Sequence, residues 1–183
     1  MTNTRSIPVV SRRLLLVLAG ITVFTSCSAL SPSGDLTGAA EITTVPVDTQ
    51  DLLQMLNAYR AAHALPPLRI DGTLNVVSLS MARHIAERDS MKTREHSPQG
   101  LSNRLSAAGY PNYAAAENLG AGYASLAAAF AGWQGSDGHD KNLLNPYVTR
   151  AGIGRTRRSN GKWRNFWVLT LARPEADGRP VLR

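Results

Sequence analysis

Two runs of residues near the C-terminus constrain the fold more than any other feature of the sequence. Residues 151–157 and 163–172 are alternating stretches rich in β-branched and aromatic side chains, and they flank Ser159-Asn160-Gly161. An Asn-Gly pair between two such runs is the strongest short-range signal for a β-hairpin. The chain is therefore expected to contain an antiparallel sheet and to end in this hairpin.

The segment before the hairpin has the periodicity of α-helices. One helix is predicted to begin at Asp48–Asp51, where acids suit a helix start, and to stop before Pro66-Pro67. A second helix follows Asp71, a good N-cap residue, and its apolar spacing continues to about Met91.

Shorter elements follow. The pattern predicts a helix over residues 101–108 that ends at Gly109, a strand over residues 113–119, and a helix that Ser125 caps and that carries Trp133. Because these elements do not alternate as β-α-β units, we expect an α+β fold with helices packed over an antiparallel sheet.

Composition supports a single globular domain. Hydrophobic residues make up 43% of the 183 residues and charged residues 18%, unlike a disordered chain. Cys27 is the only cysteine, so the domain holds no internal disulfide and its core must supply the stability.

The first 26 residues are typical of a signal peptide. A basic start ends in Arg12-Arg13, and the eleven apolar residues 14–24 are too few to span a bilayer. Phe24-Thr25-Ser26-Cys27 resembles the lipobox of bacterial lipoproteins, which predicts lipidation at Cys27 and a membrane anchor. An ordinary cleavage near Ser28-Ala29 is the alternative, and the paired arginines leave both general and twin-arginine export open.

Residues 27–47 are rich in Ser, Thr, Pro and Gly, which predicts a flexible tether between the anchor and the folded domain. We place the domain at residues 48–175 and a C-terminal tail at residues 176–183. The predicted location is the cell envelope, lipid-anchored, or else periplasmic or extracellular.

Three titratable residues are candidates for a functional site. His96 and His139 lie in turn-rich segments, where functional groups are usually presented. Glu117 interrupts an otherwise apolar strand, and a buried carboxylate needs a charged or hydrogen-bonding partner. The two histidines are the candidates to partner it.

Ser136 precedes His139 by three residues, at the predicted end of the Trp133 helix. A catalytic set of Ser136, His139 and Glu117 is chemically conceivable, with Glu117 orienting the imidazole. The sequence around Ser136 lacks the first glycine of a G-x-S-x-G elbow, so this signal is weak. Two imidazoles with a carboxylate nearby are also a set that can hold Zn²⁺, although two imidazoles alone make a loose site.

Several ordered motifs are similar to those of the CAP superfamily (cysteine-rich secretory proteins, antigen 5 and pathogenesis-related proteins) in its bacterial form. The resemblance covers residues 48–174. It rests on these segments: Leu56-Asn57-Ala58-Tyr59-Arg60, His96-Ser97-Pro98, Gly109-Tyr110, Ala116-Glu117-Asn118-Leu119, Trp133-Gln134-Gly135-Ser136-Asp137-Gly138-His139, and Gly152-Ile153-Gly154.

The resemblance implies a three-layer α-β-α sandwich with a central antiparallel sheet and a cleft lined by two histidines and two acids. His96 and His139 match the histidines, which in some members bind a divalent metal, often zinc. Glu117 matches the first acid. Ser136 stands where many eukaryotic members have the second acid, so a bound cation would meet less negative charge. Protons compete with a metal for imidazole nitrogens, so we expect metal capture to weaken as the pH falls.

Two functions remain open at this point. One is a non-enzymatic module at the cell envelope whose cleft holds a ligand, such as a lipid or an envelope component. The other is a hydrolase of peptides or envelope polymers that uses His139 with Ser136 or with a metal-bound water. The fold alone does not choose between them.

The C-terminal part of the chain is basic. Residues 150–183 hold nine bases and two acids, and the bases gather around the predicted hairpin. Export makes nucleic acid an unsuitable partner for this cluster. An anionic envelope surface and a solvated edge strand protected by arginine are the two interpretations that fit.

Overall fold

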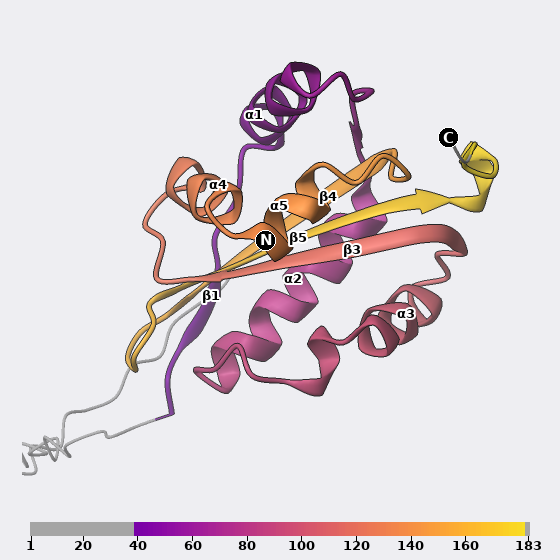
Figure 1. The fold of residues 1–183 in the computed structure, drawn as a ribbon. Coiled ribbons are helices and arrows are strands. Elements are labelled where there is room, and N and C mark those ends of the chain that lie inside the picture. The colour runs from indigo at the N-terminus through magenta and orange to yellow at the C-terminus, as the bar shows by residue number, and fades with distance from the viewer. Residues whose placement is uncertain (1–38, 182–183) are drawn as a thin grey trace, which may run out of the picture. The chain divides into compact units, whose positions relative to one another are not determined.

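The computed structural model describes residues 39–181, which contain one domain (Figure 1). The predicted signal peptide, Cys27 and most of the predicted tether lie outside the described residues. No helix within the described part combines the length and the apolar character needed to cross a membrane.

The centre of the domain is a five-stranded sheet. Four strands follow the order β1-β4-β5-β3, and the short fifth strand, β2, pairs with β4. All pairs are antiparallel except β2 with β4. The strands are β1 (Ile42–Thr44), β2 (Arg69–Ile70), β3 (Asn112–Ala121), β4 (Arg150–Arg158) and β5 (Asn165–Pro174).

Helices cover both faces of this sheet (Figure 1). One layer contains α1 (Thr49–Ala62), α4 (Leu126–Gln134) and α5 (Asp137–Leu143). The other contains α2 (Gly72–Glu87) and α3 (Pro98–Ala107). Two short 3₁₀ helices, η1 (Arg94–His96) and η2 (Glu175–Asp177), complete the domain. The fold is the three-layer α-β-α sandwich with a central antiparallel sheet that the sequence predicted.

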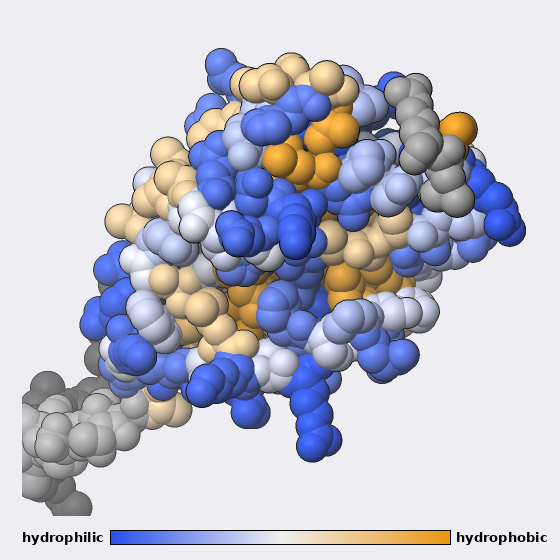
Figure 2. All heavy atoms as spheres, in the orientation of Figure 1, coloured by the Kyte–Doolittle hydropathy of each residue, from blue (hydrophilic) through white to orange (hydrophobic). Residues whose placement is uncertain are grey.

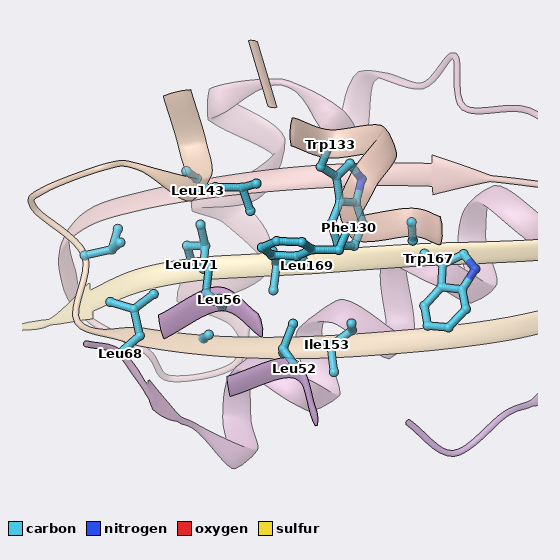
Figure 3. Packing of buried hydrophobic residues seen from close by; sticks show 14 residues of the cluster. Leu52, Leu56, Leu68, Phe130, Trp133, Leu143, Ile153, Trp167, Leu169 and Leu171 are labelled. Atoms are coloured by element: carbon cyan, nitrogen blue, oxygen red, sulfur yellow. The ribbon is translucent and has the colours of Figure 1, made fainter. Parts of the chain in front are cut away.

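The alternation of side chains along β5 divides the core between the two layers. Trp167, Leu169 and Leu171 pack with α1, α4 and α5 (Figure 3). Phe166 and Val168, on the opposite face of the strand, pack against α2. Residues 38–183 form one compact unit and contain every member of these buried clusters. A chain beginning at Gly38 therefore keeps its complete core.

Two glycines of β4 allow α2 to lie directly on the sheet. A Cβ atom on Gly152 would collide with the backbone of Leu74, and one on Gly154 would collide with the backbone of Leu79. Neither neighbour is the flexible end of a side chain, so a larger residue would push the helix away. The Gly-x-Gly spacing in β4 is thus a packing requirement of the fold.

The domain extends further at both ends than the sequence predicted. Residues 42–44, which we placed in the tether, form β1 and pair with Arg158, Arg157 and Thr156 of β4. Asp177, which we placed in the tail, makes an ion pair with Arg150 at 2.6 Å. Both segments are too short and too polar to show a periodicity in the sequence. They are ordered by partners that are distant in sequence.

The second helix is shorter than predicted, and the hairpin loop is longer. Helix α2 ends at Glu87 rather than near Met91, and Arg158 donates hydrogen bonds to the carbonyl oxygens of Ala86 and Glu87 at its end. The next carboxylate, Asp89, accepts hydrogen bonds from two backbone amides of the hairpin loop. These contacts fix the loop over residues 159–164, whereas the two predicted runs left residues 158–162 between them.

Ser136 and His139 do not continue the Trp133 helix as predicted. Helix α4 ends at Gln134, and α5 begins at Asp137 with Ser136 in the N-cap position. The break gives α5 its own direction (Figure 1) and brings it against β3, which carries Glu117.

Candidate functional site

Glu117 lies at the centre of the predicted site and is buried. Only 2% of its side chain is exposed, and its Oε2 atom accepts two hydrogen bonds. Arg104 Nη2 donates one at 2.9 Å, and His96 Nδ1 donates the other at 3.1 Å. The carboxylate therefore has both a cation and an imidazole as partners, which meets the condition that burial imposes on it.

Arg104 is the partner that sequence reasoning missed. It lies on α3, which also carries the buried Leu101 and Leu105, and its side chain reaches both Glu117 and the backbone oxygen of Glu95 at 3.2 Å. The signal available in the sequence was its position three residues after Leu101, on the face of α3 that turns inward. This arginine neutralises the carboxylate charge of Glu117, for which we had considered only the two histidines as partners.

His96 ends the 3₁₀ helix η1 and presents one side of its ring to solvent. Its side chain is 34% exposed, while Nδ1 is bound to Glu117. A carboxylate oxygen only accepts hydrogen bonds, so Nδ1 carries the proton. In a neutral ring this leaves the lone pair on Nε2. Glu117 thus fixes both the tautomer and the orientation of His96.

His139 comes from α5 and lies close enough to His96 for the two rings to interact electrostatically. Burial lowers the pKa of His139 below its usual value, and the charge of His96 lowers it further. The backbone oxygen of His139 accepts a hydrogen bond from Asn118 at 3.0 Å. Asn142 then binds Asn118 at 2.8 Å and the Glu117 carbonyl at 3.2 Å, so two amides join α5 to β3.

Ser136 is partly exposed at the start of α5, and its side chain makes no capping hydrogen bond. Within residues 39–181, no hydrogen bond joins its hydroxyl to His139, and none joins His139 to Glu117. Of the four candidate residues from the sequence, His96 and Glu117 are joined by a hydrogen bond. His139 is linked to His96 only because the charge of His96 lowers the pKa of His139. Ser136 stands apart from that network.

The candidate site offers a divalent metal few donors. Two imidazoles are available, but residues 39–181 contain no group of three or more His, Cys, Asp or Glu side chains that could hold a metal ion. Glu117 Oε1 is buried without a partner among the described residues, as are Nε and Nη1 of Arg104. The guanidinium offsets the carboxylate, so the site offers a cation little net charge. His96 and His139 are the two imidazoles that a bound metal would use here.

The face that carries α4 and α5 is mixed: hydrophilic residues are numerous, and patches of hydrophobic residues show among them, including one where α4 lies (Figure 2). One cavity has a lining that reaches Glu95, the residue before His96. It has a volume of about 510 Å³ and is lined by His84, Arg88, Lys92, Thr93, Arg94 and Glu95. It neighbours the candidate site and contains neither His96 nor His139.

The sequence matches the protein family described as CAP, cysteine-rich secretory protein family, over residues 53–171. It is 26% identical over 103 residues to the uncharacterized protein YkwD of Bacillus subtilis (strain 168), an alignment that covers 56% of this chain and 40% of that protein. The chain thus spans less than half the length of this relative.

Solved structures agree with this match. An extracellular protein containing a SCP domain from Bacillus anthracis str. Ames aligns with a TM-score of 0.57 at 28% identity, over 68% of this chain and 39% of that one. An outer surface protein from Borrelia burgdorferi aligns with a TM-score of 0.63 at 19% identity, over 73% of this chain and 99% of that one. The second likeness concerns the fold alone.

Proposed function

Because the chain belongs to the cysteine-rich secretory protein (CAP) family, we propose that it is an exported module that binds a ligand without transforming it. The proposed site consists of His96 and His139, with Glu117 as the residue that positions His96. The observation that carries this proposal is the attachment of Glu117, whose buried carboxylate is bound by Arg104 and His96. A carboxylate held in this way orients an imidazole for binding.

The same observation weighs against the hydrolase. A relay from Ser136 through His139 to Glu117 needs Glu117 to orient His139, but its bound oxygen serves His96 instead. Ser136 lacks a base in register within the described residues. A serine-directed covalent probe tests this point, and we expect no labelling of Ser136. Stoichiometric labelling that Ser136→Ala abolishes would restore the hydrolase.

The proposal of export and anchoring rests on the N-terminal pattern, and export agrees with the description of a structural relative. Residues 1–26 have the charge and the apolar run of a signal peptide, and Cys27 follows a lipobox-like sequence. The structurally similar Bacillus anthracis protein is described as extracellular. We propose that the mature chain is tethered to the cell envelope through acylated Cys27 and that its ligand is a lipid or another envelope component. The mass of the intact mature protein reports the acyl chains.

The proposal includes a divalent metal that the site binds weakly. His96 and His139 would hold it, leaving its other positions to water or to the bound molecule. The metal would supply a positive charge that attracts an anionic group. The resident guanidinium of Arg104 lies near, so we expect weak affinity compared with a closed structural zinc site.

Isothermal titration of Zn²⁺ into residues 38–183 tests the proposed site. We expect the wild-type domain to bind one ion, and His96→Ala and His139→Ala each to remove the heat of binding. Ser136→Ala is the matched control, because this substitution removes a nearby polar group outside the proposed ligand pair, and it should bind as the wild type does. Equal binding by all four proteins would refute the assignment of the two histidines.

A further inference from the structure

The chain enters the described domain beside the tip of the β4–β5 hairpin. Strand β1 pairs with the end of β4, so that Ile42 lies opposite Arg158. The backbone oxygen of Glu41 accepts a hydrogen bond from the amide of Ser159 at 2.9 Å. Figure 1 shows the start of β1 and the hairpin tip at the same end of the sheet. We call residues 157–164 the hairpin tip.

The hairpin tip is strongly basic. It contains four bases and no acid: Arg157, Arg158, Lys162 and Arg164. Arg158 is occupied, because its guanidinium donates to the carbonyl oxygens at the end of α2. The other three side chains are exposed, and none of them forms an ion pair within residues 39–181. Their charges are therefore available to a partner.

A hollow of about 280 Å³ lies between the hairpin tip and β1. Its lining includes the guanidinium residues Arg157 and Arg164 and the hydroxyl residues Thr43 and Ser159, together with Glu41. Two guanidinium groups and the Ser159 hydroxyl are donors suited to the oxygens of a phosphodiester, whereas the Thr43 hydroxyl donates to the backbone oxygen of Arg157. Glu41 is the single acid among them, and the arginines outnumber it.

An aromatic residue completes the hairpin tip. Trp163 is partly buried, and the ammonium of Lys162 lies 4.9 Å from the centre of its ring. Tryptophan beside lysine is the combination that favours the boundary between water and lipid, where the ring sits at headgroup level and the cation meets phosphate.

From these observations we infer that the hairpin tip docks the domain on anionic phospholipid headgroups of the membrane. This inference rests on the proposed function in one respect, the acylation of Cys27. The sixteen residues from Cys27 to Ile42 span at most about 55 Å when fully extended. An anchored chain therefore keeps the hairpin tip near the lipid surface, and each exposed base there contributes about as much as one basic residue of a polybasic segment.

Vesicle binding by residues 38–183 tests the inference without the lipid anchor. We expect the fragment to sediment with vesicles of phosphatidylcholine and phosphatidylglycerol, to ignore vesicles of phosphatidylcholine alone, and to be released by high salt. The triple variant Arg157→Glu, Lys162→Glu, Arg164→Glu should bind the anionic vesicles at least about 100-fold more weakly.

A control variant with the same change of net charge separates local docking from general attraction. Arg69→Glu, Lys141→Glu, Arg179→Glu alters exposed cations away from the hairpin tip, and Arg69 pairs with Arg150 at the opposite end of β4. We expect it to stay within a few-fold of wild type. Brominated lipids should also quench the fluorescence of Trp163. Trp133 and Trp167 should contribute little to this quenching, because each is only 1% exposed. Circular dichroism melting checks that both variants fold.

Two results would overturn the inference. One is equal loss of vesicle binding by the two triple variants, which would show an unspecific charge effect. The other is capture of the fragment by soluble polyphosphate with no binding to anionic vesicles, which would assign the hairpin tip to an acidic polymer. Neither result touches the zinc titration or the mass of the mature chain, so failure here is distinct from failure of the proposed function.

Discussion

Arg104 of α3 and Glu117 of β3 form an ion pair at 2.9 Å between the sheet and the helix that covers it. The carboxylate is 2% exposed and the guanidinium side chain 16%. The same carboxylate oxygen binds His96, so the pair both stabilises the packing of α3 and sets the position of the imidazole. The stability of the fold and the geometry of the candidate site therefore depend on one contact.

Breaking this pair should destabilise the domain strongly. Glu117→Gln leaves the Arg104 cation largely buried without its counter-charge, and we expect a loss of about 3 kcal/mol in the free energy of unfolding, measured in urea. Because the double variant Arg104→Met, Glu117→Gln removes both charges, it should lose clearly less than the sum of the single losses. Additivity within about 0.5 kcal/mol would show that the two side chains do not interact.

Gly154 should tolerate no side chain. A Cβ atom there would meet the backbone of α2, so Gly154→Ala should lower the free energy of unfolding by about 2 kcal/mol or more. Gly72→Ala, at the start of the same helix, has nothing within 4 Å of the new Cβ and serves as the control. We expect it to be neutral or slightly stabilising. Equal effects of the two substitutions in thermal melting would disprove the close approach of α2 to β4.

His139 should make the domain sensitive to mild acid. Its folded pKa is lowered by burial and by His96, so below about pH 6.5 the unfolded chain binds more protons than the folded one. Stability should therefore fall as the pH drops through that value. His139→Gln should reduce this loss between pH 7.5 and pH 5 in urea titrations. A variant that loses as much stability as the wild type over this range would contradict the shift.

Asp177 acts at a lower pH, through its ionised carboxylate. Hydrogen bonds from Arg150 and Thr149 hold the pKa of its carboxyl well below the usual range. Its contribution to stability is present above the unfolded pKa of about 3.9 and is lost as the pH falls towards the folded one. Asp177→Asn should thus destabilise the domain at pH 6 and flatten its acid unfolding below pH 4. An unchanged acid transition would show that the ion pair contributes nothing.

The sequence predicted the elements whose signals are local. Asp48, Asp71, Ser97 and Ser125 cap helices through hydrogen bonds to nearby amides, and the first, second and fourth of these helix starts were predicted from residue type alone. The alternating runs around Asn160-Gly161 likewise predicted β4 and β5. Each of these features depends on neighbours within a few residues.

Features that depend on distant partners were missed. Strand β1 exists because residues 42–44 find β4 more than a hundred residues later, and α2 ends where Arg158 meets its carbonyl groups. The partnership of Arg104 with Glu117 has the same origin, since the two residues lie on elements that only the packing of the layers brings together. Motif resemblance supplied the candidate site residues but gave no indication of this arginine.

The most direct test of the proposed site is a zinc titration of the wild-type domain followed by long-range ¹H–¹⁵N spectra of its imidazoles. The domain contains four histidines, so each ring reports separately. We predict that the Nε2 signals of His96 and His139 shift together at the same zinc concentration. His63 and His84 bond through a ring nitrogen to Tyr59 and Thr93 and should stay in place. A shift of His96 without His139, or equal shifts of all four rings, would contradict a binding site shared by His96 and His139.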